Sequence, residues 1–538
     1  MKELATDVLI VGGGVGGCAA ALAVCRAGHR AVLTEETDWI GGQLTSQAVP
    51  PDEHGWIEEF GCTASYRRFR HLVREHYRRF YPLTEQAMAN PHLNPGNGWV
   101  SPLCHEPKAA LLVLEAMLAP HTSSGRLIIL RQHVPVAAEI NGDRVRAVVL
   151  EDRRTGDRRA ISARYFLDAT ELGDLLPLTG TEFVTGAESR DQTGEPNAKP
   201  KPEPYNVQAF SVCFALSYHP GEDHTIEKPA EYDSWRDYVP RLTPAWPGRL
   251  FSWTISNPRT LQPHTYRFDP ASETGRAFSG LWTYRRILDR RNFIQGLMPS
   301  DISLMNVPML DYLEGDITDA ATRAQHLARA RQQSLSFLYW LQTEAPRPDG
   351  SSGFPELKLR ADVVGDTEDG LAKAPYIRES RRIRAEFTVC EQHVSAALRP
   401  HDERAERFED SVGIGYYRID LHPTCGGDNY LDVASLPFQI PLGALLPVRM
   451  DNLLPACKNI GTTHITNGCY RLHPVEWNVG EAAGYLAAFC LDQKERPRAV
   501  RARKMGDFQR MLMTAGIELA WPAELDLREG DPHRHASP

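Results

Sequence analysis

The chain has 538 residues, of which 42% are hydrophobic and 24% charged, and its formal net charge is −9. This balance is that of an ordinary globular protein, and it excludes a mainly disordered chain, a coiled coil and a collagen-like fibre. The negative net charge gives no global positive field, so we expect neither a nucleic acid nor a membrane surface as a partner. The apolar runs also fall short of the roughly 18 residues that a membrane-spanning helix needs.

Cysteine and histidine usage bears on the compartment and on metal content. The ten cysteines include no C-x-x-C pair, and Met1–Thr6 shows no secretory signal before the first apolar run. Free thiols in a reducing cytoplasm are therefore expected. His422 and Cys425 alone supply too few ligands for a zinc site, so we predict no metal.

The first 34 residues fit one strand–glycine turn–helix–strand unit. Residues 7–11 are apolar and of strand length, residues 18–24 are small and helix-compatible, and residues 31–34 form a second apolar run. Between the first strand and the helix, the glycines fit G-x-G-x-x-G, which allows a tight turn and lets a pyrophosphate approach the backbone at the helix N-terminus. The residues predicted to form this dinucleotide site are Gly12, Gly14, Gly16 and Gly17.

An acidic residue at the end of the second strand completes the pattern. Glu35 lies 21 residues after Gly14 and is expected to accept hydrogen bonds from the adenosine ribose hydroxyls. Glu36 is the alternative, because strand ends are predicted only to within a residue or two. For the whole motif, a tight turn without a ligand remains the other interpretation. The glycine pattern alone does not distinguish NAD from FAD.

The later segments mix helices and strands. Residues 62–81 carry six arginines and predict a solvated helix. Residues 127–168 predict β structure with a hairpin at Asn141-Gly142, ending in a strand at Asp168. A long helical pattern covers about residues 319–343. Near the C-terminus, small residues predict a helix that starts at Gly480.

That last helix could direct backbone N–H groups at the pyrimidine carbonyl of a flavin, and its positive end would stabilise the reduced flavin. The residues expected to make this contact are Gly480, Ala482 and Ala483. A close-packed helix in the core is the alternative interpretation.

Taken together, these segments resemble the FAD-dependent oxidoreductases with a glutathione-reductase-type FAD fold, in particular a large bacterial group named simply for that activity. The matching pieces are Gly12–Gly17, Glu35, Gly41–Thr45, Asp168–Thr170, Tyr376–Ile383 and Gly480–Gly484. The strand-end motif of the wider fold usually has glycine where this chain has Glu171. The resemblance implies FAD as the cofactor, with Asp168 in its binding site, but it does not imply a substrate.

In the family that the chain resembles, the loop at Gly41–Thr45 passes the pyrophosphate and the flavin ring. The resemblance therefore implies cofactor contacts from Gly42, Gln43 and Thr45, with a surface turn as the alternative.

The fold class that follows is α/β: a Rossmann-like FAD-binding domain with a β-meander, plus a mixed α+β substrate domain. The proposed boundaries are 1–200 for the first part of the FAD-binding domain, 201–410 for the substrate domain, 411–500 for the second part, which closes on the flavin, and 501–538 for a C-terminal helix and flexible tail.

Three residues are candidate catalytic groups: His473, Arg378 and Arg381. A neutral His473 could take a proton from the substrate, with an apparent pKa near the ordinary value of about 6.5; a histidine bonded to backbone is the alternative. Arg378 would share a helix face with Arg382 and could clamp a carboxylate or a sugar; a solvated charged helix is the alternative.

Weaker candidates of the same kinds are His464, His422 and Tyr284–Arg286. The expected function is oxidation of a small polar molecule by hydride transfer to FAD, as a dehydrogenase or oxidase with an unidentified electron acceptor. A single glycine fingerprint argues against a separate NAD(P)H domain. A monooxygenase or reductase that uses NAD(P)H and a non-catalytic electron-transfer flavoprotein stay as alternatives. A homo-oligomer and a covalent flavin link are left open.

Overall fold

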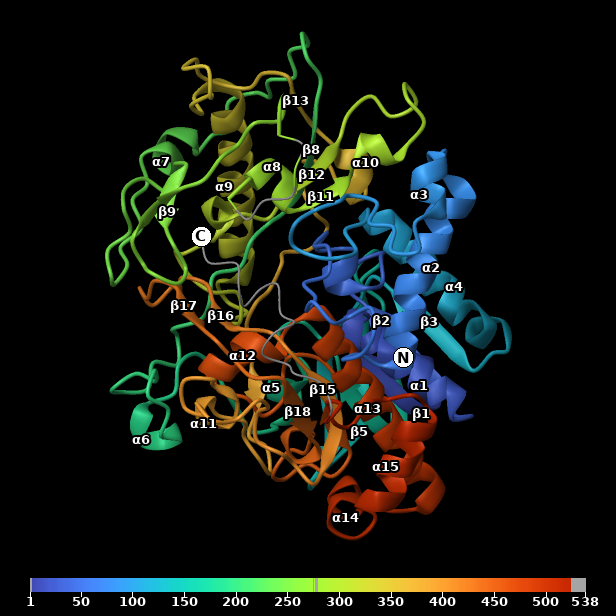
Figure 1. The fold of residues 1–538 in the computed structure, drawn as a ribbon. Helices are drawn as coiled ribbons and strands as arrows, with labels where there is room; N and C mark the ends of the chain where they lie inside the picture. Colours follow the sequence, from blue (N-terminus) through green and yellow to red (C-terminus); the bar gives the residue numbers. More distant parts are fainter. Residues whose placement is uncertain (1, 274, 276–278, 524–538) are drawn as a thin grey trace.

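The computed structural model describes residues 2–273, 275 and 279–523 (Figure 1). Strand β1 (Lys2–Val11), helix α1 (Val15–Arg26) and strand β2 (Ala31–Glu35) form the predicted first unit. Gly12 joins strand to helix with φ +101°, a left-handed conformation that favours glycine, and a side chain there would clash with the carbonyl of Ala169.

The central sheet has seven strands in the order β3-β2-β1-β6-β5-β4, and β19 also pairs with β6. Strands β2, β3, β6 and β19 run parallel to their neighbours around β1, whereas β4, β5 and β6 form an antiparallel meander. The predicted hairpin turn at Asn141-Gly142 is present, with Gly142 at φ +59°. The bounds of these strands are Leu127–Arg131 for β3, His133–Asn141 for β4, Arg144–Asp152 for β5, Arg158–Asp168 for β6 and Leu453–Pro455 for β19. The Rossmann-like α/β class with a β-meander is thereby confirmed.

Helix α13 (His473–Gln493) brings the C-terminal part of the chain onto the N-terminal helix α1 (Figure 1). The two helices cross in backbone contact, because a side chain at Gly480 would clash with the backbone of Gly16, and one at Gly484 would lie 2.6 Å from the carbonyl oxygen of Ala20. The prediction that this helix starts at Gly480 is wrong. It starts two turns earlier, with Pro474 in its first turn, where proline loses no helical hydrogen bond.

A second, antiparallel sheet lies in the middle of the chain, in the order β11-β12-β8-β13. Its strands are Phe214–Tyr218 for β8, Arg286–Leu288 for β11, Ile302–Met305 for β12 and Leu357–Leu359 for β13. The long helix predicted near residues 319–343 is α9 (Arg323–Thr343), which packs on this sheet through an aromatic core that includes Phe214 and Phe337. The mixed α+β character expected for this segment is confirmed.

Shorter elements complete the chain. In the N-terminal half they are η1 (Gly42–Leu44), α2 (Ala64–Phe80), α3 (Glu85–Ala89), α4 (Pro107–Ser123), α5 (Leu175–Thr179), β7 (Phe183–Val184), α6 (Arg190–Thr193), α7 (Tyr232–Arg236), β9 (Thr254–Ser256) and β10 (Pro263–Thr265). In the C-terminal half they are α8 (Leu281–Tyr284), η2 (Arg290–Asn292), η3 (Pro308–Leu310), α10 (Ala361–Val364), β14 (Arg382–Ile383), α11 (Glu391–Val394), β15 (Ser411–Gly415), β16 (Ile419–Leu421), β17 (Leu431–Val433), β18 (Phe438–Pro441), η4 (Leu442–Leu445), α12 (His464–Tyr470), α14 (Pro497–Arg503) and α15 (Met505–Thr514).

Two further findings concern the C-terminal tail and the length and polarity of the helices. The flexible tail predicted from Gly530 lies outside the described residues. Within the described ranges, every helix is too short or too polar to cross a membrane.

The arginine-rich helix α2 differs from the solvated helix that its composition predicts. Arg70 and Arg74 are buried, and both pair with Glu58, at 2.7 Å and 2.5 Å. Arg70 also binds Glu53 through Nε at 2.8 Å. Because Glu53 follows Asp52 directly, this buried network fixes the loop that carries Asp52 against the helix.

We predict that Arg70→Met lowers the free energy of unfolding by about 3–5 kcal/mol, because it leaves the buried carboxylate of Glu53 without its cationic partner. Arg68→Met, on an exposed position of the same helix, is the matched control and should change stability little. Denaturant unfolding of both variants tests this, and equal stability of the two would contradict the structural role of the network.

Candidate active site

The glycine turn and Glu35 form a cradle at the carboxyl end of β1. The backbone N–H of Gly13 donates to Glu35 Oε2 at 3.1 Å, and Thr37 donates to Oε1 through its N–H at 2.9 Å and its hydroxyl at 2.8 Å. Burial raises the pKa of Glu35 to about 8. Glu36 is exposed, so Glu35 is the acid that lies against the turn.

A second part of the cradle lies at the N-terminus of α1, where Gly14 is the N-cap. A Cβ on Gly42 would lie 2.8 Å from the Cα of Gly14, so the two glycines face one point. The carboxylate of Glu171 lies at that point, 2.8 Å and 2.7 Å from the Cβ positions of Gly14 and Gly42. Its Oε2 accepts from the ammonium of the buried Lys458, whereas Oε1 has no hydrogen-bond partner in the described part of the chain.

This arrangement fits a dinucleotide. An anion already lies at the helix N-terminus, the place where the macrodipole and free N–H groups favour a phosphate. This place at the N-terminus of α1 is bordered by the backbone of Gly14 and Gly42 and by the flexible side chain of Glu171. Gly12 forms the tight turn, and Gly17 packs its helix against the backbone of Gly12.

The loop after β2 leads from the cradle toward the inside of the protein. The amide of Gln43 donates to Glu476 Oε2 at 2.6 Å and to the carbonyl of Arg471 at 3.2 Å. The hydroxyl of Thr45 donates to the carbonyl of Ile40 at 2.6 Å, so its proton is already used. Gln47 is buried, and neither amide atom has a partner among the described residues. Gln47 is thus a stronger candidate for cofactor contact than Thr45, and nothing in the sequence marked it.

Asp168 shapes the turn after β6. One carboxylate oxygen accepts from the N–H and hydroxyl of Thr170, at 3.1 Å and 2.7 Å, and the other accepts from the N–H of Leu175 at 3.1 Å. Burial raises its pKa to about 7. The chain itself supplies these partners, so the geometry gives Asp168 a role in holding the loop that carries Glu171.

The contacts expected from the C-terminal helix need correction. Gly480 packs on Gly16, and Ala482 and Ala483 are buried in the hydrophobic core. With the helix start at His473, the reason for placing these three residues at the flavin is lost. The free N-terminal groups belong to the turn His473–Glu476, and Glu476 Oε1 accepts from the N–H of Gly16 at 3.3 Å.

His473 does not have the properties expected of a base. Its Nδ1 accepts from the backbone N–H of Asp52 at 3.1 Å, so its single proton lies on Nε2. Burial lowers its pKa well below the ordinary value, so the expected titration near 6.5 is wrong. The neutral ring is a hydrogen-bond donor and does not line the cavity described below.

The two candidate arginines are separated. Residues 376–381 form an irregular extended segment before β14, so the expected shared helix face is wrong. Arg378 lines the main cavity. Arg381 instead donates to the carbonyl of Leu172 at 2.7 Å and to Asp174 at 3.2 Å, and it lines a different depression. The clamp expected of Arg378 and Arg382 loses its helical basis, and Arg382 pairs with Glu188 and Glu379.

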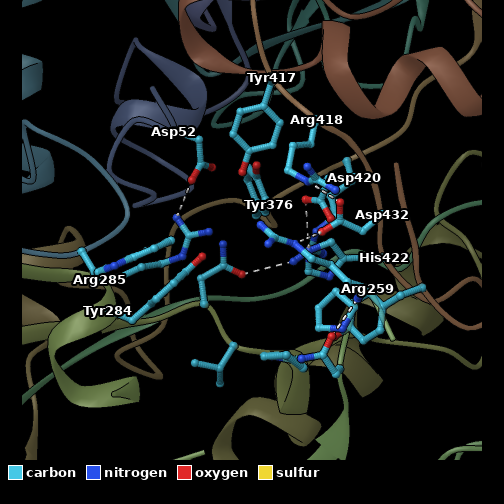
Figure 2. A pocket seen from close by; sticks show the side chains of 18 of the residues that line it. Asp52, Arg259, Tyr284, Arg285, Tyr376, Tyr417, Arg418, Asp420, His422 and Asp432 are labelled. Atoms are coloured by element: carbon cyan, nitrogen blue, oxygen red, sulfur yellow. Dashed lines mark hydrogen bonds and ion pairs between the residues drawn. The ribbon is translucent and has the colours of Figure 1, made fainter. Parts of the chain in front are cut away.

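A polar cavity lies between the middle segment and the strands β16 and β17 (Figure 2). The cavity volume is about 150 Å³. Figure 2 shows Asp52 and Arg285 on one side, Asp420, Asp432 and other polar groups on the opposite side, and tyrosine rings between them. Its guanidinium groups belong to Arg259, Arg285, Arg378, Arg418 and Arg471.

Arg471 connects the cradle to this cavity. Its carbonyl accepts from Gln43, while its guanidinium donates to the hydroxyl of Tyr376 at 3.1 Å and to Asp420 at 3.2 Å. The backbone of Asp52 makes a second connection through His473. A cofactor that extends from the glycine turn along Gln43 therefore approaches the cavity wall.

His422 forms a histidine–aspartate pair at the cavity. Its Nδ1 lies 2.8 Å from Asp311 Oδ2, and Asp311 also accepts from Ser211 at 3.2 Å and pairs with Arg378 at 3.1 Å. Burial alone would raise the pKa of Asp311, but Arg378 and His422 outweigh it and hold the pKa below its usual value. Asp311 is thus ionised and accepts from Nδ1–H of His422, while Nε2 lies on the other side of the ring, 4.0 Å from Asp420 Oδ2.

The sequence model of the family described as FAD dependent oxidoreductase matches residues 7–512. The chain belongs to this FAD dependent oxidoreductase family. Its cofactor is accordingly FAD, and the cradle described above is consistent with it. The family supports an enzyme with redox activity.

Individual relatives are distant. An L-amino acid oxidase of Cerastes cerastes is 34% identical over 73 residues, which is 14% of this chain and 14% of the oxidase. The solved structure of the myxobacterial chondrochloren halogenase CndH is 14% identical over 42% of this chain and 45% of the halogenase, with a TM-score of 0.23. That of the flavin-dependent monooxygenase PieE in complex with FAD and substrate is 18% identical over 40% of this chain and 36% of the other, with a TM-score of 0.24.

We predict that Gly14→Val gives a folded but colourless protein. A Cβ at this position meets only the end of the Glu171 side chain, which can shift, whereas it blocks the approach of a pyrophosphate. Gly506→Val is the matched control, since its Cβ has only Arg510 nearby, at 3.7 Å. Flavin absorbance and circular dichroism of the purified proteins test this. A Gly14→Val protein with a full complement of flavin would remove the turn from the cofactor site.

Glu35→Ala should weaken FAD binding by about 1–3 kcal/mol, the usual cost of leaving buried polar partners unpaired. The exposed neighbour Glu36 provides the control, because Glu36→Ala should leave the affinity unchanged. Titration of the apoprotein with FAD, followed by fluorescence quenching, measures both. If Glu36→Ala weakens FAD binding and Glu35→Ala does not, Glu36 is the acid that contacts the ribose.

Proposed function

We propose that the protein oxidises a small polar organic molecule at a hydroxyl-bearing carbon by hydride transfer, as a dehydrogenase or oxidase. The single observation that carries the proposal is the pair of His422 and Asp311 at a polar cavity that adjoins the cofactor cradle. The base expected from the sequence, His473, is replaced by His422.

Different residues would contact the different parts of FAD. Glu35 would hold the ribose, the backbone of Gly12–Gly16 would hold the pyrophosphate, and the buried donors of Gln47 and His473 would meet polar atoms of the ring. When bound, the flavin supplies a two-electron acceptor for hydride.

On the substrate side, His422 Nε2 takes the hydroxyl proton. Asp311 accepts from Nδ1 and stabilises the imidazolium that forms, and Arg378 keeps Asp311 ionised. Arg285 and Arg471 face the same cavity and orient the substrate there. The cavity thus supplies a base and polar groups that position the reacting bond.

The wider assignment follows from the same site. We propose residues 201–410 as the substrate domain, which is supported by the cavity walls from Arg259, Tyr284 and Arg378. Residues 1–200 and 411–500 are proposed to hold the flavin. All ten cysteines, each within the described ranges, are free thiols, which supports the proposed reducing compartment, the cytoplasm.

We predict that His422→Asn keeps FAD bound and slows flavin reduction by substrate by roughly 10²–10⁴, the usual contribution of a general base. Anaerobic stopped-flow bleaching of the flavin by substrate measures this rate in both proteins.

His326→Asn is the matched control for that experiment. His326 is also bonded through Nδ1, to the hydroxyl of Tyr312 at 2.9 Å, but it does not line the cavity, so its loss should leave the rate unchanged. A His422→Asn protein that reduces its flavin at the wild-type rate would rule out His422 as the base. Fast bleaching by NADPH without substrate would instead favour an NAD(P)H-using monooxygenase or reductase.

A further inference from the structure

We propose that the cavity recognises a neutral, hydroxyl-rich ring, that is, a free sugar or a glycoside, rather than a carboxylate or an amine. This inference names the substrate class of the cavity and rests on the proposed oxidation of a hydroxyl-bearing carbon. It is carried by the pairing of charges, by the unpartnered polar atoms and by the aromatic rings of the lining.

The charges of the cavity are paired with one another. Arg285 binds Asp52 at 3.3 Å, Arg471 binds Asp420 at 3.2 Å, and Arg378 binds Asp311 at 3.1 Å. The two remaining guanidinium groups share one carboxylate; they are those of Arg259 and Arg418, both on Asp432. A carboxylate substrate calls for a guanidinium whose fork is free to bind it in bidentate fashion. Each of the five guanidinium groups contacts one of four carboxylates, so none has its fork turned to the cavity without an acid beside it.

The same pairs place donors and acceptors side by side. A hydroxyl group donates one hydrogen bond and accepts up to two, so it matches a surface that offers both. A carboxylate only accepts, and an ammonium only donates, so neither would satisfy such a surface.

Several polar atoms of the lining residues have no hydrogen-bond partner in the part of the chain that the structure describes. They are Arg285 Nε, Arg471 Nε, Asn306 Nδ2 and the hydroxyl of Tyr430. Leaving a buried polar group without a partner costs free energy. A ligand rich in hydroxyls can supply acceptors for the N–H groups and a partner for the tyrosine hydroxyl. The four residues come from four separate places in the chain and line one cavity.

Aromatic rings form the rest of the lining. Trp99 and Tyr284 stack with ring centroids 5.4 Å apart, and Tyr376 and Tyr417 lie between the two groups of ion pairs (Figure 2). The face of an aromatic ring carries partial negative charge and attracts the partly positive C–H bonds on one face of a sugar ring. Small hydroxy acids and short amines have no such face.

The chemistry then balances as an alcohol oxidation. The C–H bond of the carbinol carbon breaks, and its two electrons leave with the hydride to the FAD. The hydroxyl proton passes to His422 Nε2, and the C–O bond becomes a carbonyl. The product is a keto sugar, or a lactone where the anomeric carbon reacts.

The ligand class is tested first by binding alone. Calorimetric titration of the FAD-loaded protein measures the affinity for compounds of each class. The probes are D-glucose, D-galactose, myo-inositol and methyl β-D-glucopyranoside, against L-lactate, D-gluconate, L-leucine and L-proline. At least one neutral sugar or polyol should bind, and the acids and amino acids should not. The same compounds are then tested for anaerobic bleaching of the flavin.

A variant of Asp420 provides a second test of the ligand class. Asp420→Asn leaves the guanidinium of Arg471 uncompensated, so it should weaken sugar binding at least tenfold and permit binding of D-gluconate, with FAD content unchanged. Asp451→Asn is the matched control, because Asp451 is a buried acid paired with Arg498 outside the cavity, at 2.7 Å.

The outcomes separate the two proposals. Binding or bleaching by an acid or amino acid, with none by sugars, overturns the sugar assignment and leaves the proposed oxidation standing. Sugar binding that responds to Asp420→Asn, without bleaching by any of the compounds, supports the ligand class and overturns the oxidation. A wild-type protein that binds no sugar or polyol of the set also overturns the inference.

Discussion

The close crossing of helices α1 and α13 is the contact on which the rest of the structure depends. The backbones meet at Gly16 and Gly480, because a side chain on Gly480 would clash with the backbone of Gly16, while one on Gly16 would clash with the carbonyl of Ala456 after β19. This crossing brings together parts of the chain more than 450 residues apart and sets the first turn of α13 beside the N-terminus of α1, where Glu476 accepts from the N–H of Gly16. Two helix N-termini thus share the place that a dinucleotide needs.

The crossing of α1 and α13 also sets the position of the substrate cavity. Arg471 immediately precedes α13, and its carbonyl binds Gln43 beside the cradle while its guanidinium reaches the cavity. On the other side, the buried contact between Arg70 and Glu53 fixes the loop of Asp52. The cofactor cradle and the cavity are therefore aligned by a few backbone and ionic contacts, and His422, directly after β16, lines the cavity.

Local patterns predicted the parts of this arrangement that depend on local physics. The turn at Gly12 and the hairpin at Asn141-Gly142 follow from backbone conformations that only a few residue types adopt, and Glu35 follows from its spacing after the glycine turn. The cavity depends on pairs distant in the sequence, such as Asp311 with His422, and no local pattern marks them. The arginines at 378–382 have helical spacing, yet Arg382 is held by Glu188 and Glu379, and Ile383 pairs with Phe183, so the segment is extended. A glycine such as Gly480 suits a helix start and a helix crossing equally, and only the packing decides between them.

A crystal structure of the protein with bound FAD tests most directly whether the cradle and the cavity meet at the flavin ring. We predict that the pyrophosphate lies against Gly14 and Gly42, with the side chain of Glu171 moved away, and that the ring contacts Gln47 and His473 and is open to the cavity near Arg471. A pyrophosphate elsewhere, or a flavin ring separated from the cavity by protein, would contradict it.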